Sequence, residues 1–137
     1  MKVLIDTNII MDVLADREGF SESASLIFKL CEIGRIQGVV YALSIANIAY
    51  IMRKELNRSQ IEEVISKLAS IFTIADMKGD DLKKAAVQPM ADFEDALQSV
   101  CASRLKADFI ITRNLKDFKN SKVMAIKPDE LIERMSE

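Results

Sequence analysis

The sequence predicts an α/β fold in which helices cover both faces of a central, mostly parallel sheet of about five strands. Two observations carry this prediction. Short runs of almost uninterrupted apolar residues are typical of strands that are buried on both faces of a sheet. Between these runs, apolar residues recur at helical spacing, so that strands and helices alternate along the chain.

The strands are predicted at five apolar runs, which are KVLI at 2–5, GVVYAL at 38–43, IFTIA at 71–75, FIIT at 109–112 and VMAI at 123–126. In a parallel sheet the carboxyl ends of the strands meet at one edge. Ligands bind at that edge in open α/β folds, so polar residues that directly follow a strand are candidates for a site.

Helices are predicted from apolar stripes within 9–14, 20–31, 45–52, 61–68 and 93–105. Ser44 and Ser59 are the predicted N-caps of the helices over 45–52 and 61–68, and Glu62 would complete a capping box with Ser59. Pro128 is expected in the first turn of a last short helix.

Length and composition predict an ordinary soluble protein with one domain over 1–137. No apolar run approaches the roughly 20 residues that a membrane-spanning helix needs. The opening MKVLIDTN reaches an acid at position 6, which leaves no apolar region for a signal peptide. We therefore expect a cytoplasmic protein without membrane association.

The chain contains no histidine, which excludes Ser–His–Asp and Cys–His catalysis and His-ligated zinc. Its net charge of −2 excludes a broadly basic nucleic-acid-binding surface, although basic residues cluster locally. Cys31 and Cys101 lie on the apolar helical stripes and are predicted to be buried free thiols.

Polar residues lie at the carboxyl ends of two predicted strands. Asp6 directly follows KVLI, and a second group comprises Thr112, Asn114 and Asp117 at the end of FIIT and after it. Asp6 could instead cap the helix over 9–14, since Asp is a good N-cap. Asp12, inside that helix, is expected to pair with a surface base such as Arg17.

The stretch ADFEDALQSVCA at 91–102 places three acids at the start of a helix. Capping and the helix macrodipole would explain such acids without any site. Asp92 and Asp95 lie three residues apart on a face beside the apolar stripe, so they are candidates for a shared cleft. Glu94 is expected to be a solvated surface acid on another face, together with Gln98.

Asp6, Asp95 and Asp117 come from distant parts of the sequence and are predicted to meet at one edge of the sheet. Carboxylates held close together repel each other unless a cation or protons neutralise them. Oxygen ligands without His or Cys select Mg²⁺ or Mn²⁺, and these ions support phosphodiester hydrolysis.

The pattern VLIDTNIIMDVL followed by DFEDALQSVCASRLKADFIITRNLKDF resembles the PIN-domain family, in particular the small prokaryotic PIN proteins that include VapC-type toxins. The resemblance covers essentially the whole chain. It implies a PIN-like three-layer α/β/α sandwich and Mg²⁺- or Mn²⁺-dependent cleavage of single-stranded RNA. It also implies a homodimer and, for the toxins, a cognate antitoxin protein.

By position, the metal-site acids of the family fall on Asp6, Asp95 and Asp117, with Asp92 as a supporting acid. Supporting polar positions of the family fall on Asn8, Thr112 and Asn114. The family usually has a Glu in the helix after the second strand, and in LSIANIAYIM that position is Asn47. An asparagine can offer a carbonyl ligand, but it brings no negative charge.

The predicted function is a metal-dependent endoribonuclease in which Asp6, Asp95 and Asp117 are catalytic and Arg113 and Lys116 hold the RNA backbone. These two basic residues could equally belong to a solvated loop. Two alternatives remain open. One is a weak or inactive PIN-fold module that binds RNA or protein. The other is a phosphoacceptor receiver domain, another α/β fold with clustered acids and a lysine, here Lys127, after the last strand.

Overall fold

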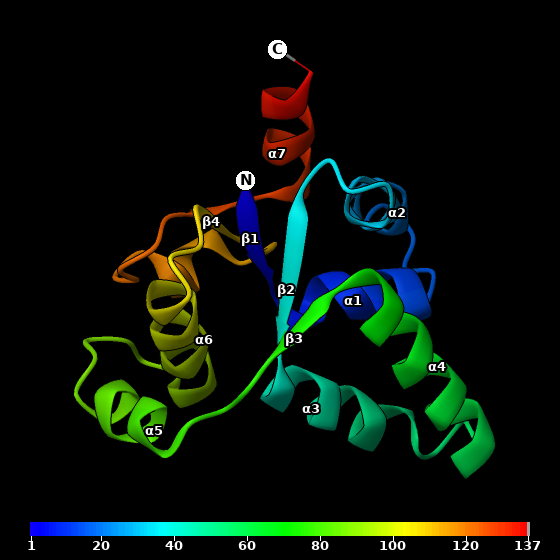
Figure 1. The fold of residues 1–137 in the computed structure, drawn as a ribbon, viewed down its shortest axis with the longest axis horizontal. Coiled ribbons are helices and arrows are strands. Elements are labelled where there is room, and N and C mark those ends of the chain that lie inside the picture. Colours follow the sequence, from blue (N-terminus) through cyan, green and yellow to red (C-terminus); the bar gives the residue numbers. More distant parts are fainter. Residues whose placement is uncertain (137) are drawn as a thin grey trace.

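A five-stranded parallel sheet lies at the centre of the computed structural model, which describes residues 1–136 (Figure 1). Its strands are β1 (Lys2–Ile5), β2 (Gln37–Tyr41), β3 (Thr73–Ala75), β4 (Phe109–Ile111) and β5 (Ala125–Ile126). Their spatial order is β3-β2-β1-β4-β5. In the central strand Leu4 pairs with Val39 of β2 and with Ile110 of β4. The chain order therefore reverses beside β1, which is where ligands bind in such sheets.

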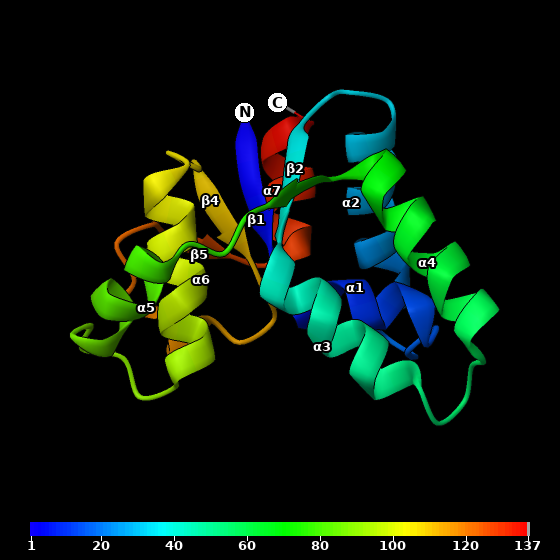
Figure 2. The same cartoon turned by 60° about the horizontal axis from the view of Figure 1, so that its bottom comes forward.

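Helices cover both faces of the sheet (Figure 2). One face carries α1 (Thr7–Leu14), α2 (Ser21–Glu32), α3 (Ala42–Met52), α4 (Arg58–Ile71) and α7 (Pro128–Met135). The opposite face carries α5 (Gly79–Ala86) and α6 (Phe93–Arg104). This arrangement confirms the predicted PIN-like three-layer α/β/α sandwich.

Two apolar cores lie on opposite faces of the sheet because successive side chains of a strand alternate in direction. Val3 and Ile5 of β1 pack into the core beneath α1, α2, α4 and α7, whereas Leu4 packs into the core beneath α5 and α6. All three side chains are fully buried. The uninterrupted apolar run in β1 is the consequence of this two-sided burial.

Two predicted N-caps are wrong. Ser44 lies inside α3, which begins at Ala42 directly after Tyr41, so the chain turns from strand to helix without a separate capping segment. In α4 the cap is Asn57 rather than Ser59. Asn57 and Gln60 exchange two hydrogen bonds of 2.9 Å, which form the capping box two residues earlier than predicted. The prediction for Pro128 is confirmed, because it opens α7.

The short helix α5 was not predicted from the sequence, and a buried polar network fixes it to its neighbours. Asp81 of α5 is 1% exposed. It accepts a hydrogen bond of 2.8 Å from the Tyr41 hydroxyl and two bonds of 3.0 Å from the Arg104 guanidinium. These contacts join β2, α5 and α6 into one unit.

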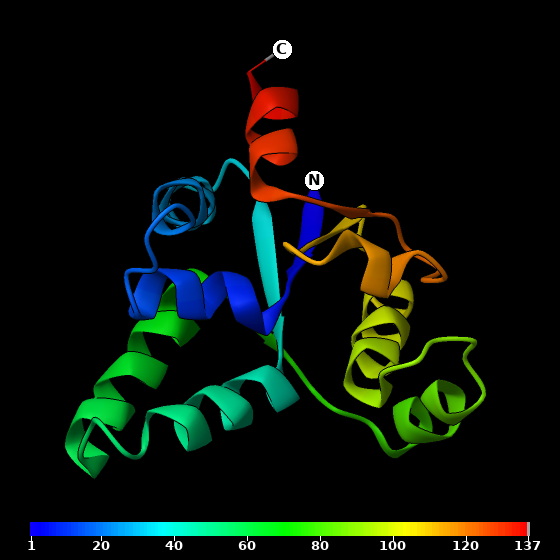
Figure 3. The same cartoon turned by 180° about the vertical axis from the view of Figure 1, so that it is seen from behind.

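The segment after β3 carries the chain to the other side of the sheet, so that α5 and α6 lie apart from α3 and α4 (Figure 3).

Cys31 and Cys101 are buried free thiols, as predicted, and burial raises the pKa of each to about 12. Within residues 1–136, the helices are too short or too polar to cross a lipid bilayer.

Candidate active site

Asp6 occupies the N-cap position of α1, but its side chain does not cap the helix. One carboxylate oxygen accepts a hydrogen bond of 2.7 Å from Thr112 Oγ1, and the other accepts a bond of 2.7 Å from Gln98 Nε2. Asp6 is only 6% exposed. The capping alternative therefore does not account for this buried carboxylate, which Thr112 after β4 and Gln98 of α6 hold in one orientation.

Thr112 directly follows β4 and fixes the loop beside Asp6. Its side chain is fully buried, and its hydroxyl accepts a hydrogen bond of 3.1 Å from the Asn114 backbone N–H. The Asp6 backbone N–H donates to the Ile111 carbonyl at 3.0 Å. The side chain of Asn114 is exposed at the start of the 3₁₀ helix η1 (Leu115–Phe118).

Asp95 lies in the first turn of α6, and its pKa is raised to about 7. Burial is the largest cause, and repulsion from Asp92, Asp6, Asp117 and Glu94 adds to it in that order. The acids predicted from β1, α6 and the segment after β4 are therefore near enough to repel one another. Asp117 itself is exposed on η1.

Asp92 acts as the N-cap of α6, because its Oδ1 accepts a hydrogen bond of 2.9 Å from the Asp95 backbone N–H. The capping explanation of the acidic stretch thus holds for this residue. Its proximity also disfavours ionisation of Asp95, so Asp92 adds negative charge beside the site.

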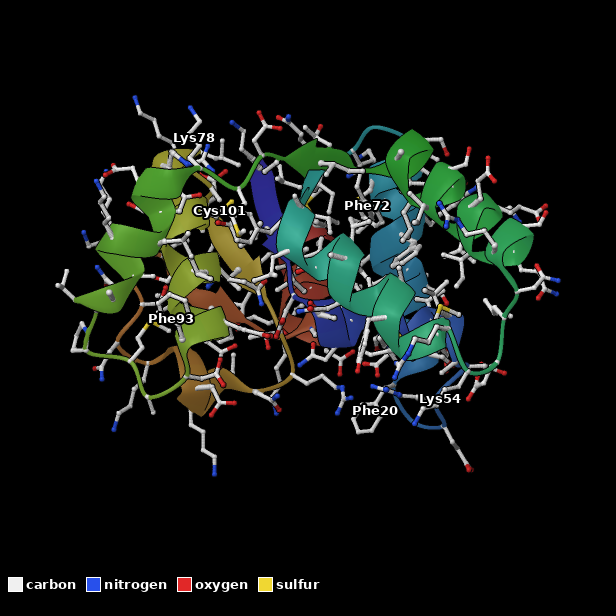
Figure 4. All side chains as sticks on the ribbon, turned by 90° about the horizontal axis from the view of Figure 1, so that it is seen from below. Phe20, Lys54, Phe72, Lys78, Phe93 and Cys101 are labelled. Carbon is white, nitrogen blue, oxygen red and sulfur yellow. The ribbon has the colours of Figure 1, made fainter. Side chains whose placement is uncertain are left out.

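A pocket of about 300 Å³ opens beside Asp6 at the carboxyl edge of the sheet, between α3 and α6. Its lining residues are Asp6, Thr7, Asn47, Tyr50, Ile51, Glu94, Asp95 and Gln98. Figure 4 looks onto this edge, with α3 and α6 in front; the labelled Phe93 lies on the side of α6 that is turned away from α3.

The predictions about the faces of α6 are only partly confirmed. Glu94 is exposed, as predicted, but it lines the pocket beside Asp95 and does not lie on a separate face. Gln98 is 5% exposed and donates to Asp6, so its predicted place away from the site is wrong. Phe93, predicted on the buried stripe, is 48% exposed. The reason is that α6 is buried on almost every side from Ala96 to Ala102, between the sheet, α5 and the loop after β4. An apolar stripe therefore does not reveal which side of this helix faces solvent.

Two buried oxygens at this edge lack hydrogen-bond partners within residues 1–136, Asn8 Oδ1 and Gln98 Oε1. The carboxylate of Asp6 can only accept, so Gln98 must turn its amide nitrogen toward Asp6 and leave its oxygen without a partner. A buried unsatisfied acceptor costs roughly 1–3 kcal/mol. A divalent cation, or a donor in its hydration shell, would satisfy such an oxygen.

The residues fit a hard divalent cation in their chemistry. Three acids line the pocket, and among its lining residues within 1–136 there is no lysine or arginine. In the described part of the chain, no three acids converge closely enough to hold an ion as they stand. Binding of an ion by three acids therefore requires acidic side chains at this edge to move closer together than they stand here.

Arg113 forms an ion pair within the protein. Its Nε and Nη2 donate to the Asp12 carboxylate at 2.7 and 2.9 Å, and its guanidinium lies 4.0 Å from the centre of the Phe20 ring. Asp12 is 1% exposed. The predicted pair of Asp12 with Arg17 is also present, at 3.3 Å. Contact of Arg113 with RNA stays a prediction, as does that of Lys116, which is exposed on η1.

Lys127, which the receiver alternative requires near Asp6, lines a separate pocket with Asp12 and Arg113. That pocket has a volume of about 330 Å³ and is not lined by Asp6 or Asp95. The geometry therefore gives the receiver alternative no support.

Comparison with known proteins gives the same fold. A family profile described as PIN domain matches residues 2–116. No curated protein matches the chain. Among solved structures, the VapBC2 complex of Rickettsia felis bound to a promoter DNA fragment has 16% identity and a TM-score of 0.70, covering 93% of this chain and 98% of that chain.

Two further structures share the fold. A toxin–antitoxin complex from Klebsiella pneumoniae has 21% identity and a TM-score of 0.70, with 92% of this chain and 97% of that chain covered. VapC20 of Mycobacterium tuberculosis, a toxin that cleaves the sarcin–ricin loop, has 9% identity and a TM-score of 0.61, with 79% and 86% covered. With a family profile that matches most of its length, the chain belongs to the PIN-domain family.

Proposed function

We propose that this protein is a Mg²⁺- or Mn²⁺-dependent nuclease that hydrolyses phosphodiester bonds of single-stranded RNA. The observation that carries the proposal is the convergence of acids on Asp95. Its pKa is raised to about 7 by burial and by acids from three other places, the helix cap, β1 and η1. Such a concentration of negative charge at a ligand-binding edge is typical of a cation site.

Asp6, Asp95 and Asp117 are the proposed ligands, directly or through water, with Asp92 beside them. When bound, a divalent ion neutralises charge that develops on the phosphate and makes water a stronger nucleophile. Thr112 and Gln98 hold both oxygens of Asp6 in place, which keeps this ligand oriented before any ion arrives. Asn8, Asn47 and Asn114 are proposed to support the site as polar neighbours.

The raised pKa of Asp95 should make the protein's affinity for a divalent ion depend on pH. A carboxyl with a pKa of about 7 is partly protonated at neutral pH, so a bound cation displaces a proton from it. The protein's affinity for the ion should therefore rise as pH increases from 6 to 8.

For the substrate, we propose that Lys116 contacts the RNA backbone from η1, beside the acids. Arg113 would reach a phosphate only with the part of its guanidinium that Asp12 leaves unused. The similarity to a toxin that cleaves the sarcin–ricin loop favours RNA as the substrate.

The similarity to toxin–antitoxin complexes favours a cognate antitoxin as the protein partner. We further propose, from membership of the PIN-domain family, that the protein acts as a homodimer. A cytoplasmic location is a separate proposal, which rests on the sequence.

A second candidate function is an RNA- or protein-binding module without nuclease activity. Two observations favour it: within residues 1–136 no three acids are poised around one ion, and Asn47 brings no charge to α3. Under this alternative the protein would bind RNA with no dependence on Mg²⁺ or Mn²⁺.

Substitution of the two best-positioned acids tests the nuclease. Asp6→Asn and Asp95→Asn should each abolish Mn²⁺-dependent cleavage of a mixed-sequence single-stranded RNA. Circular dichroism should show that both variants remain folded. Glu63→Gln, which changes an exposed acid of α4 outside the pocket, should cleave as the wild type does. Cleavage retained by both variants would refute Asp6 and Asp95 as the active-site acids, and absence of cleavage by the wild type would refute the nuclease.

A further inference from the structure

Within residues 1–136, neither a capping bond nor a salt bridge explains the position of one carboxylate in the acidic pocket. Glu94 lies in the first turn of α6, one residue before Asp95, and lines the pocket together with Asp6. The capping bond of this helix is made by Asp92, so Glu94 is not needed for it. Glu94 is exposed, and repulsion from Asp6 and Asp95 would favour its turning away from the pocket, so another contact must hold it there.

That contact lies across the pocket, on α3. Asn47 Nδ2 donates a hydrogen bond of 3.3 Å to Glu94 Oε2. Asn47 of α3 and Glu94 of α6 both line the pocket, so this bond joins the two helices across it. The amide engages one oxygen, and the other oxygen of Glu94 keeps its capacity for a ligand.

A second observation points to a ligand in the same pocket. Gln98 lies one turn beyond Glu94 and is 95% buried, since only 5% of it is exposed. Its Nε2 is used by Asp6, and its Oε1 has no partner among the described residues. A buried acceptor without a partner, in a residue that lines the pocket, is satisfied by a water molecule, another hydrogen-bond donor or a cation.

We propose that Glu94 is a metal-ligating residue of this pocket, held in place by Asn47, and that it supplies a third carboxylate beside Asp6 and Asp95. The inference rests on the proposed metal-dependent function and deepens it. Asn47 is then a positioning residue: its amide donates to the acid without adding charge. In this arrangement Glu94 of α6 supplies the negative charge, and Asn47 of α3 positions it by a hydrogen bond. The pair would take the place of a single acid at position 47.

The alternative is that Glu94 only stabilises the start of α6 through the helix macrodipole. Glu22 is a matched control for this effect, because it is an exposed Glu at the second position of α2, just as Glu94 is at the second position of α6. A purely electrostatic role at a helix start would make the two acids equivalent with respect to metal binding.

The test is Mn²⁺ binding by isothermal titration calorimetry on the full chain at pH 7.5, without RNA. Glu94→Gln should weaken Mn²⁺ binding at least tenfold, whereas Glu22→Gln should leave it unchanged. The double variant Asn47→Glu with Glu94→Asn places the carboxylate on α3 and the amide on α6. It should restore the affinity for Mn²⁺ to within about threefold of the wild type.

Asn47→Ala covers the case in which the double exchange fails to fold, because it keeps Glu94 but removes its partner. It should weaken binding by a smaller factor than Glu94→Gln does. Wild-type affinity in both Glu94→Gln and Asn47→Ala would overturn the inference.

Failure of the inference is distinguishable from failure of the proposed function. If Mn²⁺ binds the wild type and Asp6→Asn abolishes binding while Glu94→Gln does not, only the role of Glu94 is refuted. If the wild type binds no Mn²⁺ and does not cleave RNA, the metal-dependent function itself is refuted, and the role of Glu94 with it.

Discussion

At the scale of single residues, Asp95 is the acid on which burial and the charges of neighbouring acids act together. An acid in a helix's first turn is ordinarily stabilised in its charged form by the macrodipole. Here burial and four neighbouring acids outweigh that effect and raise the pKa to about 7. The charged form of Asp95 therefore destabilises the folded state.

Replacement of Asp95 should change how stability depends on pH. Below the ordinary pKa of 3.8 the residue is protonated in both folded and unfolded states, and above about 7 it is ionised in both. Between these values only the folded state keeps the proton, so the wild type loses stability relative to Asp95→Asn as pH rises from about 4 to 7. After allowance for solvent screening of this partly exposed group, we expect a difference of roughly 1–2 kcal/mol.

Urea unfolding in EDTA at pH 4, 5.5 and 8 measures this effect. Asp95→Asn should match the wild type at pH 4 and exceed it at pH 8. A difference between the two proteins that does not vary with pH would contradict the raised pKa.

Substitutions at Arg113 and Lys116 should affect different properties. The Arg113 variant should lose stability, and the Lys116 variant should lose RNA binding. Arg113→Met leaves the buried Asp12 with Arg17 alone and should cost about 2–3 kcal/mol of unfolding free energy. Lys116→Ala changes an exposed side chain and should alter stability by less than about 0.5 kcal/mol.

Fluorescence anisotropy of single-stranded RNA in EDTA then reports on binding. Lys116→Ala should reduce the slope of log affinity against log salt by about 0.7. An unchanged slope would show that Lys116 does not contact the backbone.

The acids at strand ends could be predicted from the sequence because the end of each apolar run marks the end of a strand. Asp6 and Thr112 were predicted on that basis, and they share a hydrogen bond of 2.7 Å. Gln98 and Glu94 were missed because their importance depends on what lies opposite them, Asp6 and Asn47. A polar residue at position 98, within a stretch that is otherwise apolar or small, was the available signal.

At the scale of secondary structure, α6 positions the site, and its own position depends on the network around Asp81. Burial alone would raise the pKa of Asp81. Hydrogen bonds from Arg104, the Lys78 backbone N–H and Tyr41 outweigh it, so the pKa is lowered. Stability from this carboxylate is therefore complete above its ordinary pKa and is lost as pH falls through the lowered value.

Arg104→Met should break this network. It leaves Asp81 buried without its cation, and we expect a loss of about 3 kcal/mol near pH 7. Lys84→Met removes an exposed pair with Asp80 and serves as the control, with an expected change below about 0.5 kcal/mol. Chemical unfolding compares the two, and equal losses would contradict a special role for the Arg104–Asp81 pair.

The helix α5 could not be predicted because its sequence, GDDLKKAA, is short and mostly polar, and buried polar contacts hold it in place. Close packing at Gly38 is equally invisible in the sequence. A Cβ there would lie 2.6 Å from Cys31 Sγ and 2.7 Å from the Phe72 ring, so β2 needs a glycine at this point. Contacts between distant segments set both features, whereas the apolar runs of the strands are local.

At the scale of the whole molecule, the strand order explains why the acids meet. β1 is central, and its neighbours β2 and β4 lead into α3 and η1 at the same edge. The segments that carry Asp6, Asn47 and Asp117 therefore begin at the same edge of the sheet. The α/β class and the five strands could be predicted from sequence, but the order β3-β2-β1-β4-β5 rests on pairings that no local pattern specifies.

The central claim is that this edge binds a divalent ion through Asp6 and Asp95. The most direct measurement is an anomalous difference map from crystals of the wild-type protein soaked in Mn²⁺. A peak within ligand distance of the Asp6 and Asp95 carboxylates is the predicted result. A map with no peak there, from crystals in which Mn²⁺ binds elsewhere on the molecule, would contradict the account.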